Sequence, residues 1–309
     1  AEVVEQDVKN VLAAGVEIIT NIRVQSLDEL KDLGYDAVLL AVGTHESTKL
    51  RVPGEDLKGV TRASEFLKAA KLGEKLEVDD KQVVVIGGGN VAMDAARTAL
   101  RLGARSVRAV SLESLDEMPA HPREVEEATA EGVIFQNSCG VREFEGDEEV
   151  RTIGLIRCES VLNEEGRFDP TYGEDLGSIP ADFVVVAAGM RPDAGAFGLP
   201  INSGGTIQVD DETLQTAVPH VFAAGDAVLG PSMITSAAGH GSRAAFMIDR
   251  YLQGRTLDTD EFESDLPAVD RESVLARQTA YSLIPPVTPP GTTAIQPGEF
   301  YPEEETFTE

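Results

Sequence analysis

The sequence predicts an α/β protein in which a parallel sheet with covering helices is joined to an antiparallel β-meander. First, residues 81–98, KQVVVIGGGNVAMDAART, run from an apolar strand through three glycines into a helix. Second, three apolar strands end in a glycine step, in YDAVLLAVG, ADFVVVAAG and PHVFAAGD. Third, residues 139–168 alternate apolar and polar side chains around Gly146-Asp147 and Glu165-Gly166, as antiparallel hairpins do.

Each further element follows from its own pattern. Residues 2–14 have helical periodicity that ends at Gly15, and VEIIT after it is expected as a short strand. SLDELKDLG and ASEFLKAAKLG are expected as helices, and MITSAAGHGSRAAFMIDRYL as a long amphipathic helix. From about residue 254 the chain becomes acidic and rich in Pro and Thr, which predicts an extended arm without its own core.

Charge and cysteine content narrow the classes of function. The 309 residues carry 54 acidic side chains against 26 lysines and arginines, a formal net charge of −28. Phosphate recognition needs basic side chains, so this excess argues against nucleic acid or an anionic membrane as a partner. Cys139 and Cys158 form no CxxC pair, which favours a cytoplasmic protein without a dithiol of its own. The four scattered histidines show no metal-ligand spacing, so no metal site is expected.

The glycine cluster has the small residues of a GxGxxG/A dinucleotide-binding turn. Gly87 permits the tight turn, Gly89 lets the backbone approach a diphosphate, and Ala92 lets the helix pack closely on the strand. The diphosphate is expected at the helix N-terminus, where unpaired N–H groups and the positive end of the helix dipole point. The pattern therefore predicts a Rossmann-like NAD(P) site formed by Gly87, Gly88, Gly89, Asn90, Val91 and Ala92.

The residue after the second strand of this unit bears on the choice of cofactor. SVRAVSLES places Glu113 just beyond the strand, where an acid bonds the ribose 2′-OH of NAD and repels the 2′-phosphate of NADP. NADH is therefore expected over NADPH. The alternative is that Glu113 is only a solvated loop acid.

A second ligand-binding turn is expected in VFAAGDAV. The strand ends in Gly225-Asp226, which places Asp226 at the carboxyl edge of a sheet, where ligands bind in open α/β folds. The helix that begins near Met233 directs its N-terminus into the same crevice. Taken alone, Asp226 could also be a helix cap or a loop aspartate.

In combination these motifs resemble the FAD- and NAD(P)H-dependent oxidoreductases of the glutamate synthase small-subunit type, which are flavoproteins with two dinucleotide folds. The resemblance runs through YDAVLLAVGTHESTKLRVPGEDLKGV, VVVIGGGNVAMDAARTALRLGA, DEMPAHPREVEEATAEGV, IPADFVVVAAGMRPD and TAVPHVFAAGD. It implies an NAD(P)-binding domain inserted into a partial FAD-binding domain. The implied segments are 1–62 (first FAD segment), 63–217 (NAD(P)-binding domain), 218–253 (FAD return segment) and 254–309 (acidic, Pro-rich tail).

The resemblance also implies roles for single residues on the FAD side. Asp226 matches the aspartate that bonds the flavin ribityl chain, and Gly225 allows close backbone approach. Gly43 and Thr44 match a crossover that lines the FAD site. Helix N-terminal amides facing the flavin N1/O2 edge are implied for Met233, Ile234 and Thr235.

On the NAD side, the resemblance implies that Asp94 lies near the nicotinamide carboxamide and that Gly189 ends a strand bordering the cleft. Two departures stand out. Many relatives carry paired arginines where this chain has Leu112-Glu113, which agrees with NADH. A second glycine fingerprint, for the FAD diphosphate, is expected ahead of residue 1, so the chain is interpreted either as a fragment or as one half of a split protein.

The implied reaction is hydride transfer between NADH and FAD across a shared crevice, followed by electron transfer to an iron–sulfur centre in a partner or a missing domain. No catalytic acid or base is expected in the hydride step. The alternatives are an NAD-binding sensor or scaffold without its own flavin, a disulfide-reductase-like flavoprotein, and an NAD-dependent dehydrogenase acting on carbon substrates. The second of these needs a CxxC that the chain lacks.

Overall fold

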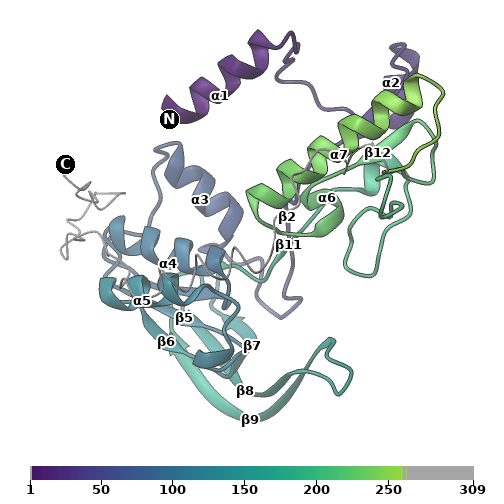
Figure 1. Ribbon diagram of the computed structural model, residues 1–309. Helices are drawn as coiled ribbons and strands as arrows, with labels where there is room; N and C mark the ends of the chain where they lie inside the picture. Colours follow the sequence, from purple (N-terminus) through teal and green to yellow (C-terminus); the bar gives the residue numbers. More distant parts are fainter. Residues whose placement is uncertain (1, 260–261, 263–309) are drawn as a thin grey trace, which may run out of the picture. The chain divides into compact units, whose positions relative to one another are not determined.

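The computed structural model describes residues 2–259 and 262, which fall into two compact units. The larger unit is His45–Arg191, and the smaller unit combines the described residues up to Thr44 with those from Pro192 onward. Figure 1 labels the helices and strands of both. Most of the tail expected at 254–309 lies outside the described residues.

The larger unit is built on a five-stranded parallel sheet in the order β3-β10-β4-β5-β6. Its strands are β3 (Val60–Arg62), β4 (Gln82–Ile86), β5 (Ser106–Val110), β6 (Ile134–Gln136) and β10 (Phe183–Val186). Its helices are α3 (Ala63–Lys71), α4 (Asn90–Arg101) and α5 (Pro122–Glu131), with a short 3-10 turn η1 (Leu115–Glu117). Parallel strands joined by helices confirm the expected Rossmann-like architecture.

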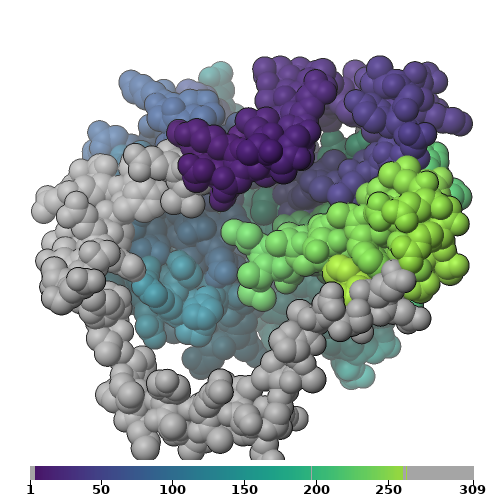
Figure 2. Space-filling model, turned by 45° about the horizontal axis from the view of Figure 1, so that its top comes forward, coloured from purple at the N-terminus to yellow at the C-terminus, as the bar shows by residue number. Residues whose placement is uncertain are grey.

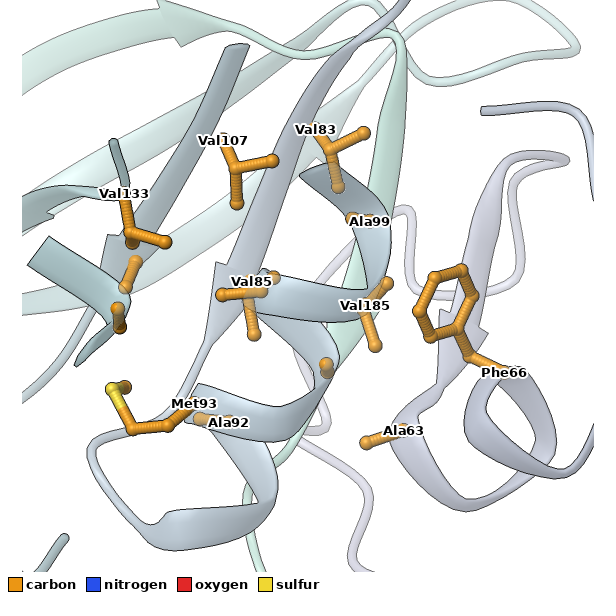
Figure 3. Close-up of a cluster of buried hydrophobic side chains, with 14 of the residues drawn as sticks. Ala63, Phe66, Val83, Val85, Ala92, Met93, Ala99, Val107, Val133 and Val185 are labelled. Carbon is orange, nitrogen blue, oxygen red and sulfur yellow. The ribbon is translucent and has the colours of Figure 1, made fainter. Parts of the chain in front are cut away.

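The sheet is covered on both faces, as the continuous apolar runs of its strands require. Val83 and Val85 of β4 belong to the core under the helices, whereas Val84 and Ile86 belong to the core under the meander. Successive side chains of a strand point to opposite faces, so β4 contributes to both layers. Figure 3 shows the helix-side core, with labelled residues Ala63, Phe66, Val83, Val85, Ala92, Met93, Ala99, Val107, Val133 and Val185.

Small residues determine how closely α4 approaches the sheet. Ala92, Ala95, Ala96 and Ala99 are all completely buried. Alanine is the best helix former and adds only a methyl group between the helix and the strands, so α4 can lie directly on β4 and β5. This packing fixes the point at which the helix begins, at the glycine cluster.

The other face carries the antiparallel meander of β7 (Cys139–Glu145), β8 (Thr152–Leu162) and β9 (Phe168–Pro180). Its two turns fall where the sequence predicted hairpins. In the second turn, the side-chain oxygen of Asn163 accepts hydrogen bonds from the amides of Glu165 and Arg167, at 3.0 Å each. Such side-chain bonds to the backbone two and four residues on are typical of asparagine turns.

The two ends of the larger unit are joined by a short antiparallel ribbon. β2 (Glu46–Ser47) pairs with β11 (Met190–Arg191), and Arg191 bonds Glu46 at 3.2 Å. Nearby, Arg62 donates to Glu55 at 2.6 Å, and both side chains of this pair are largely buried. The β2–β11 ribbon holds the first and last residues of the unit to each other, which suits a domain inserted into another by two chain crossings.

The smaller unit has a two-stranded parallel sheet, in which β1 (Val38–Leu40) pairs with β12 (Val221–Ala223). Its helices are α1 (Glu2–Ala13), α2 (Leu27–Asp32), α6 (Asp226–Leu229) and α7 (Ile234–Leu252), with a 3-10 turn η2 (Gly195–Phe197). Val38, Leu40, Val221 and Ala223 form the centre of its core with Ile207. The strand ending in Gly225-Asp226 is therefore a buried strand, as predicted.

One predicted element is absent. VEIIT forms no strand, and Val16, Ile18 and Ile19 are 47–58% exposed. A strand needs a neighbouring backbone for its hydrogen bonds, and no described residue pairs with this segment. In Figure 2, atoms of α1 (purple) and of α7 (green) both lie on the surface that faces the viewer.

Candidate nucleotide-binding sites

The glycine turn lies at the carboxyl ends of β4 and β10 and is compressed from the β10 side. Gly87 has a φ of +140°, and a Cβ atom there would lie 2.4 Å from the carbonyl oxygen of Ala187. The Gly87 amide donates to the carbonyl of Val110 at 2.9 Å, and the Ala187 amide donates to that of Ile86 at 2.7 Å. Only glycine fits a position with this conformation and this backbone contact.

Glu113 lies against the same turn. A Cβ atom on Gly88 would be 2.7 Å from a carboxylate oxygen of Glu113 and 3.3 Å from the Cβ of Ser111. Glu113 is half-buried, and it reaches the turn from the loop after β5. The position matches the one predicted for an acid that reads the adenosine ribose, and its role in recognition stays a prediction.

Gly89 differs from its two neighbours because it faces open space. No atom lies within 4 Å of the place where its Cβ would be, and its φ of −92° is an ordinary extended value. Gly89 is the N-cap of α4, and no side chain caps this helix. The N-terminus of α4 thus has room in front of its backbone amides, as a bound diphosphate requires.

The loop before α5 is hydrogen-bonded to the start of α4. The sequence pattern did not predict this contact. The Ala120 amide donates to the carbonyl of Gly88 at 3.0 Å, and the His121 amide donates to the side-chain oxygen of Asn90 at 2.7 Å. Pro122 at the first position of α5 is a helix-start signal that could have located this loop.

Ion pairs hold α5 against α4. Arg97 of α4 contacts Glu124, Glu127 and Glu131 of α5 at 2.6–3.0 Å. Asp94, one helical turn after Asn90, has its pKa raised by partial burial and by the negative charge of Glu124. The structure thus places Asp94 near α5, and its predicted contact with a nicotinamide carboxamide is untested.

The other residues predicted for this unit lie in the core or in the turn after β10. Val91 packs against the helix-side core, and Ala92 is fully buried. Gly189 lies beyond the end of β10, in the turn to β11, where its carbonyl accepts from the Thr48 amide at 3.0 Å. The residue of this strand end that contacts the glycine turn is Ala187, two positions earlier.

The smaller unit has a separate pocket of about 280 Å³ at the carboxyl ends of β1 and β12. Five of the seven residues predicted for FAD line it: Gly43, Gly225, Asp226, Met233 and Ile234. Leu39, Ala41, Ala224, Ser232, Ala237 and Gly241 complete the lining. Of the other two predicted residues, Thr44 is buried beside Gly43, and Thr235 is exposed in the first turn of α7.

A positive φ at Gly225 turns the chain into this pocket. Gly225 has a φ of +65° and is the N-cap of α6, so Asp226 is the first residue of that helix. The Ser232 hydroxyl donates to the Asp226 carboxylate at 2.6 Å, which orients the carboxylate at the pocket wall. The carboxylate keeps further acceptor capacity for a hydroxyl-bearing ligand.

Size alone does not single out this pocket. A larger cavity of about 490 Å³ lies elsewhere in the smaller unit, lined among others by Gln208, Asp211 and His240, and it contains none of the predicted residues. The described residues contain no group of three potential metal ligands. Within the same part of the chain, no helix has the length and apolar character to cross a membrane.

The fold and the two glycine-based turns define a two-dinucleotide-fold oxidoreductase, and sequence comparison agrees. Residues 2–241 match the family model described as pyridine nucleotide-disulphide oxidoreductase. The chain belongs to this family, whose members combine FAD with NAD(P). The expected resemblance to glutamate synthase small subunits is confirmed by its relatives.

Two curated relatives and one solved structure illustrate these similarities. The chain is 39% identical to the NADP(+)-dependent formate dehydrogenase subunit beta of Moorella thermoacetica, over 85% of this chain and 39% of that protein. It is 35% identical to the glutamate synthase (NADPH) small chain of Azospirillum brasilense, over 82% of this chain and 57% of that protein. The chain therefore spans well under two thirds of either relative. FprA of Mycobacterium tuberculosis in complex with NADPH has the same fold, with a TM-score of 0.61, 22% identity, and coverage of 86% of this chain and 74% of that one.

The contrast between Gly87 and Gly89 gives a test. Gly87→Ala is expected to lower the thermal midpoint because its methyl group meets the Ala187 carbonyl. Gly89→Ala is expected to fold nearly as well but to lose about tenfold or more in NADH affinity, because its methyl group occupies the space in front of α4.

The measurement is thermal unfolding together with calorimetric titration of NADH for both variants. Equal NADH affinity in Gly89→Ala and the unmodified chain would show that the diphosphate does not lie at Gly89.

Proposed function

We propose that this chain is the NADH:flavin oxidoreductase module of a larger electron-transfer enzyme, in which it passes hydride between NADH and FAD. The observation that carries the proposal is that one chain contains two turns of the nucleotide-binding kind, each at the carboxyl edge of its own parallel sheet. A protein that binds only one nucleotide has no need of the second.

The NADH side of the proposal is supported by the open space at Gly89 and the uncapped start of α4. These features suit a diphosphate, since backbone amides and the helix dipole stabilise its negative charge. The loop of Ala120 and His121 holds the turn in place before the ligand arrives. The site therefore orients the cofactor through backbone groups and needs no basic side chain.

The flavin side is supported by the pocket of Asp226. Its carboxylate, held by Ser232, would accept a hydrogen bond from a ribityl hydroxyl, and Gly43 and Gly225 would let the ligand approach the backbone. The start of α7 at Met233 and Ile234 would place its positive end beside the ligand. FAD supplies the hydride-accepting chemistry, and the protein supplies orientation and electrostatics.

The FAD diphosphate needs another group of backbone amides. The GxGxxG/A turn at Gly87 to Ala92 follows a strand and opens a helix, and the proposal assigns it to NADH. The other match to this spacing, Gly239 to Ala244, lies inside α7 and forms no turn. We propose that the FAD diphosphate is held by a polypeptide segment other than the 309 residues of this sequence.

The wider setting is also a proposal. The names of the two curated relatives, a subunit beta and a small chain, support a role within a larger assembly. An iron–sulfur protein or domain is the proposed acceptor of electrons from the flavin, since such centres accept electrons singly. A cytoplasmic setting is proposed because neither cysteine, at positions 139 and 158, is in a disulfide.

The visible spectrum of the natural protein tests the proposal directly. Purified under mild conditions with its native partners, the protein should show flavin absorbance that anaerobic NADH bleaches. A colourless protein that binds NADH would contradict the flavin assignment and favour an NAD-binding sensor or scaffold.

Asp226 provides a matched test of the pocket. Asp226→Ala is expected to lose about tenfold in FAD affinity, because a charged hydrogen-bond acceptor is removed from the ligand. The control is Asp249→Asn on the exposed surface of α7, where the Asp249 carboxylate accepts a hydrogen bond from the side-chain amide of Gln253. FAD retention after dialysis measures both, and equal retention would argue against flavin at this pocket.

Two observations bear in opposite directions on the choice between NADH and NADPH. The curated relatives and the solved structure described above are named for NADP(+) or NADPH. In this chain, however, Glu113 lies beside Gly88, where a 2′-phosphate would meet its negative charge. We therefore propose that the chain prefers NADH, and that the preference resides in this loop.

Glu113→Arg tests this preference. The substitution replaces repulsion with attraction, so the ratio of NADH to NADPH affinity should fall by at least about tenfold. Calorimetric titration with both nucleotides gives the ratio. Equal affinities in the unmodified chain would contradict the proposal.

A further inference from the structure

Ser111, the first residue after β5, is buried and uses every polar group it has. Its side chain and backbone together are only 3% exposed. Its amide donates to the Gln136 carbonyl at 3.2 Å, and its carbonyl accepts from the Cys139 amide at 2.8 Å. Its hydroxyl donates to the Glu113 carbonyl at 3.0 Å and accepts from the Asn137 side-chain amide at 2.8 Å. A buried serine whose amide, carbonyl and hydroxyl are all hydrogen-bonded is a fixed point in the loop.

The backbone of Glu113 is held from a second direction. Its carbonyl also accepts from the amide of Ser138 at 2.9 Å. Ser138 has a φ of +53°, and its own carbonyl accepts from the Cys158 amide of β8 at 2.9 Å. The loop after β5 is therefore attached to the meander, and the backbone of Glu113 cannot move without breaking bonds at its own carbonyl.

These attachments fix the backbone from which the carboxylate reaches the glycine turn. A Cβ atom on Gly88 would meet both the Glu113 carboxylate, at 2.7 Å, and the Ser111 Cβ, at 3.3 Å. Ser111 and Glu113 thus approach the glycine turn together. The absence of a side chain at Gly88 is what allows the carboxylate to come so close.

We propose that Ser111 is a specificity-determining positioning residue, which holds Glu113 at the glycine turn so that the site distinguishes NADH from NADPH. The inference rests on the proposed NADH site and its preference. A carboxylate on a free loop would turn away from a 2′-phosphate and lose most of its repulsion. A carboxylate on a fixed backbone can turn only about its own side-chain torsions, so it stays within reach of the glycine turn, keeps more of the repulsion, and needs less ordering to bond the 2′-OH.

A double-mutant cycle tests this role. Ser111→Ala should reduce the ratio of NADH to NADPH affinity by about three- to tenfold, the effect expected from losing one buried hydrogen bond that orients a charge. In the Glu113→Gln background, which removes the charge, Ser111→Ala should leave the ratio unchanged. A merely structural role would change both nucleotides alike in either background.

The control is Ser160→Ala, which removes a serine hydroxyl that donates to the Leu162 carbonyl at 2.6 Å in β8, on an exposed part of the meander. It should leave the ratio as it is. Calorimetric titration of NADH and NADPH gives the ratios, and thermal unfolding shows that each variant is folded.

Gly88→Ala tests the same geometry while keeping serine at position 111. Its methyl group would displace the Glu113 carboxylate, so it should lower the ratio even if Ser111→Ala does not fold. Suppose that the ratio of NADH to NADPH affinity falls in Glu113→Gln but is unchanged in both Ser111→Ala and Gly88→Ala. That result would overturn the role of Ser111 and leave the NADH preference standing. Equal affinities in the unmodified chain would instead overturn the proposed NADH preference.

Discussion

The close approach of two acceptor groups to the turn between β4 and α4 is the constraint on which the nucleotide site depends. The Ala187 carbonyl leaves no room for a side chain at Gly87, and the Glu113 carboxylate leaves little at Gly88. Both groups crowd the turn from within the protein, whereas Gly89 faces open space. The inner side of the turn is thereby filled while the side at Gly89 stays open, which suits a site formed before any cofactor arrives.

The same physical rule operates in both units. The carboxyl ends of parallel strands place turns and helix N-termini at one edge of a sheet, where backbone amides are available to a ligand. In the larger unit that edge carries the glycine turn, and in the smaller unit it carries Gly225, Asp226 and the start of α7. Family membership joins the chain to FAD and NAD(P) chemistry, and the assignment of one cofactor to each site is our proposal.

Much of this could be predicted from the sequence because local patterns determine it. The glycine cluster, the apolar strands and the alternating meander residues located the main elements, and five of seven residues expected at FAD line one pocket. Three features depended on contacts between distant residues. VEIIT has strand-forming residues but no described strand to pair with. The Ala120–His121 loop and the bonds of Ser111 join residues up to 32 positions apart, and no local pattern reports such contacts.

A crystal structure of the chain with NADH bound would test the account most directly. We predict that the diphosphate lies in front of Gly89 and the first turn of α4, with an adenosine ribose hydroxyl donating to the Glu113 carboxylate. A nucleotide found instead in the cavity beside His240, or elsewhere with the Gly89 site empty, would contradict it.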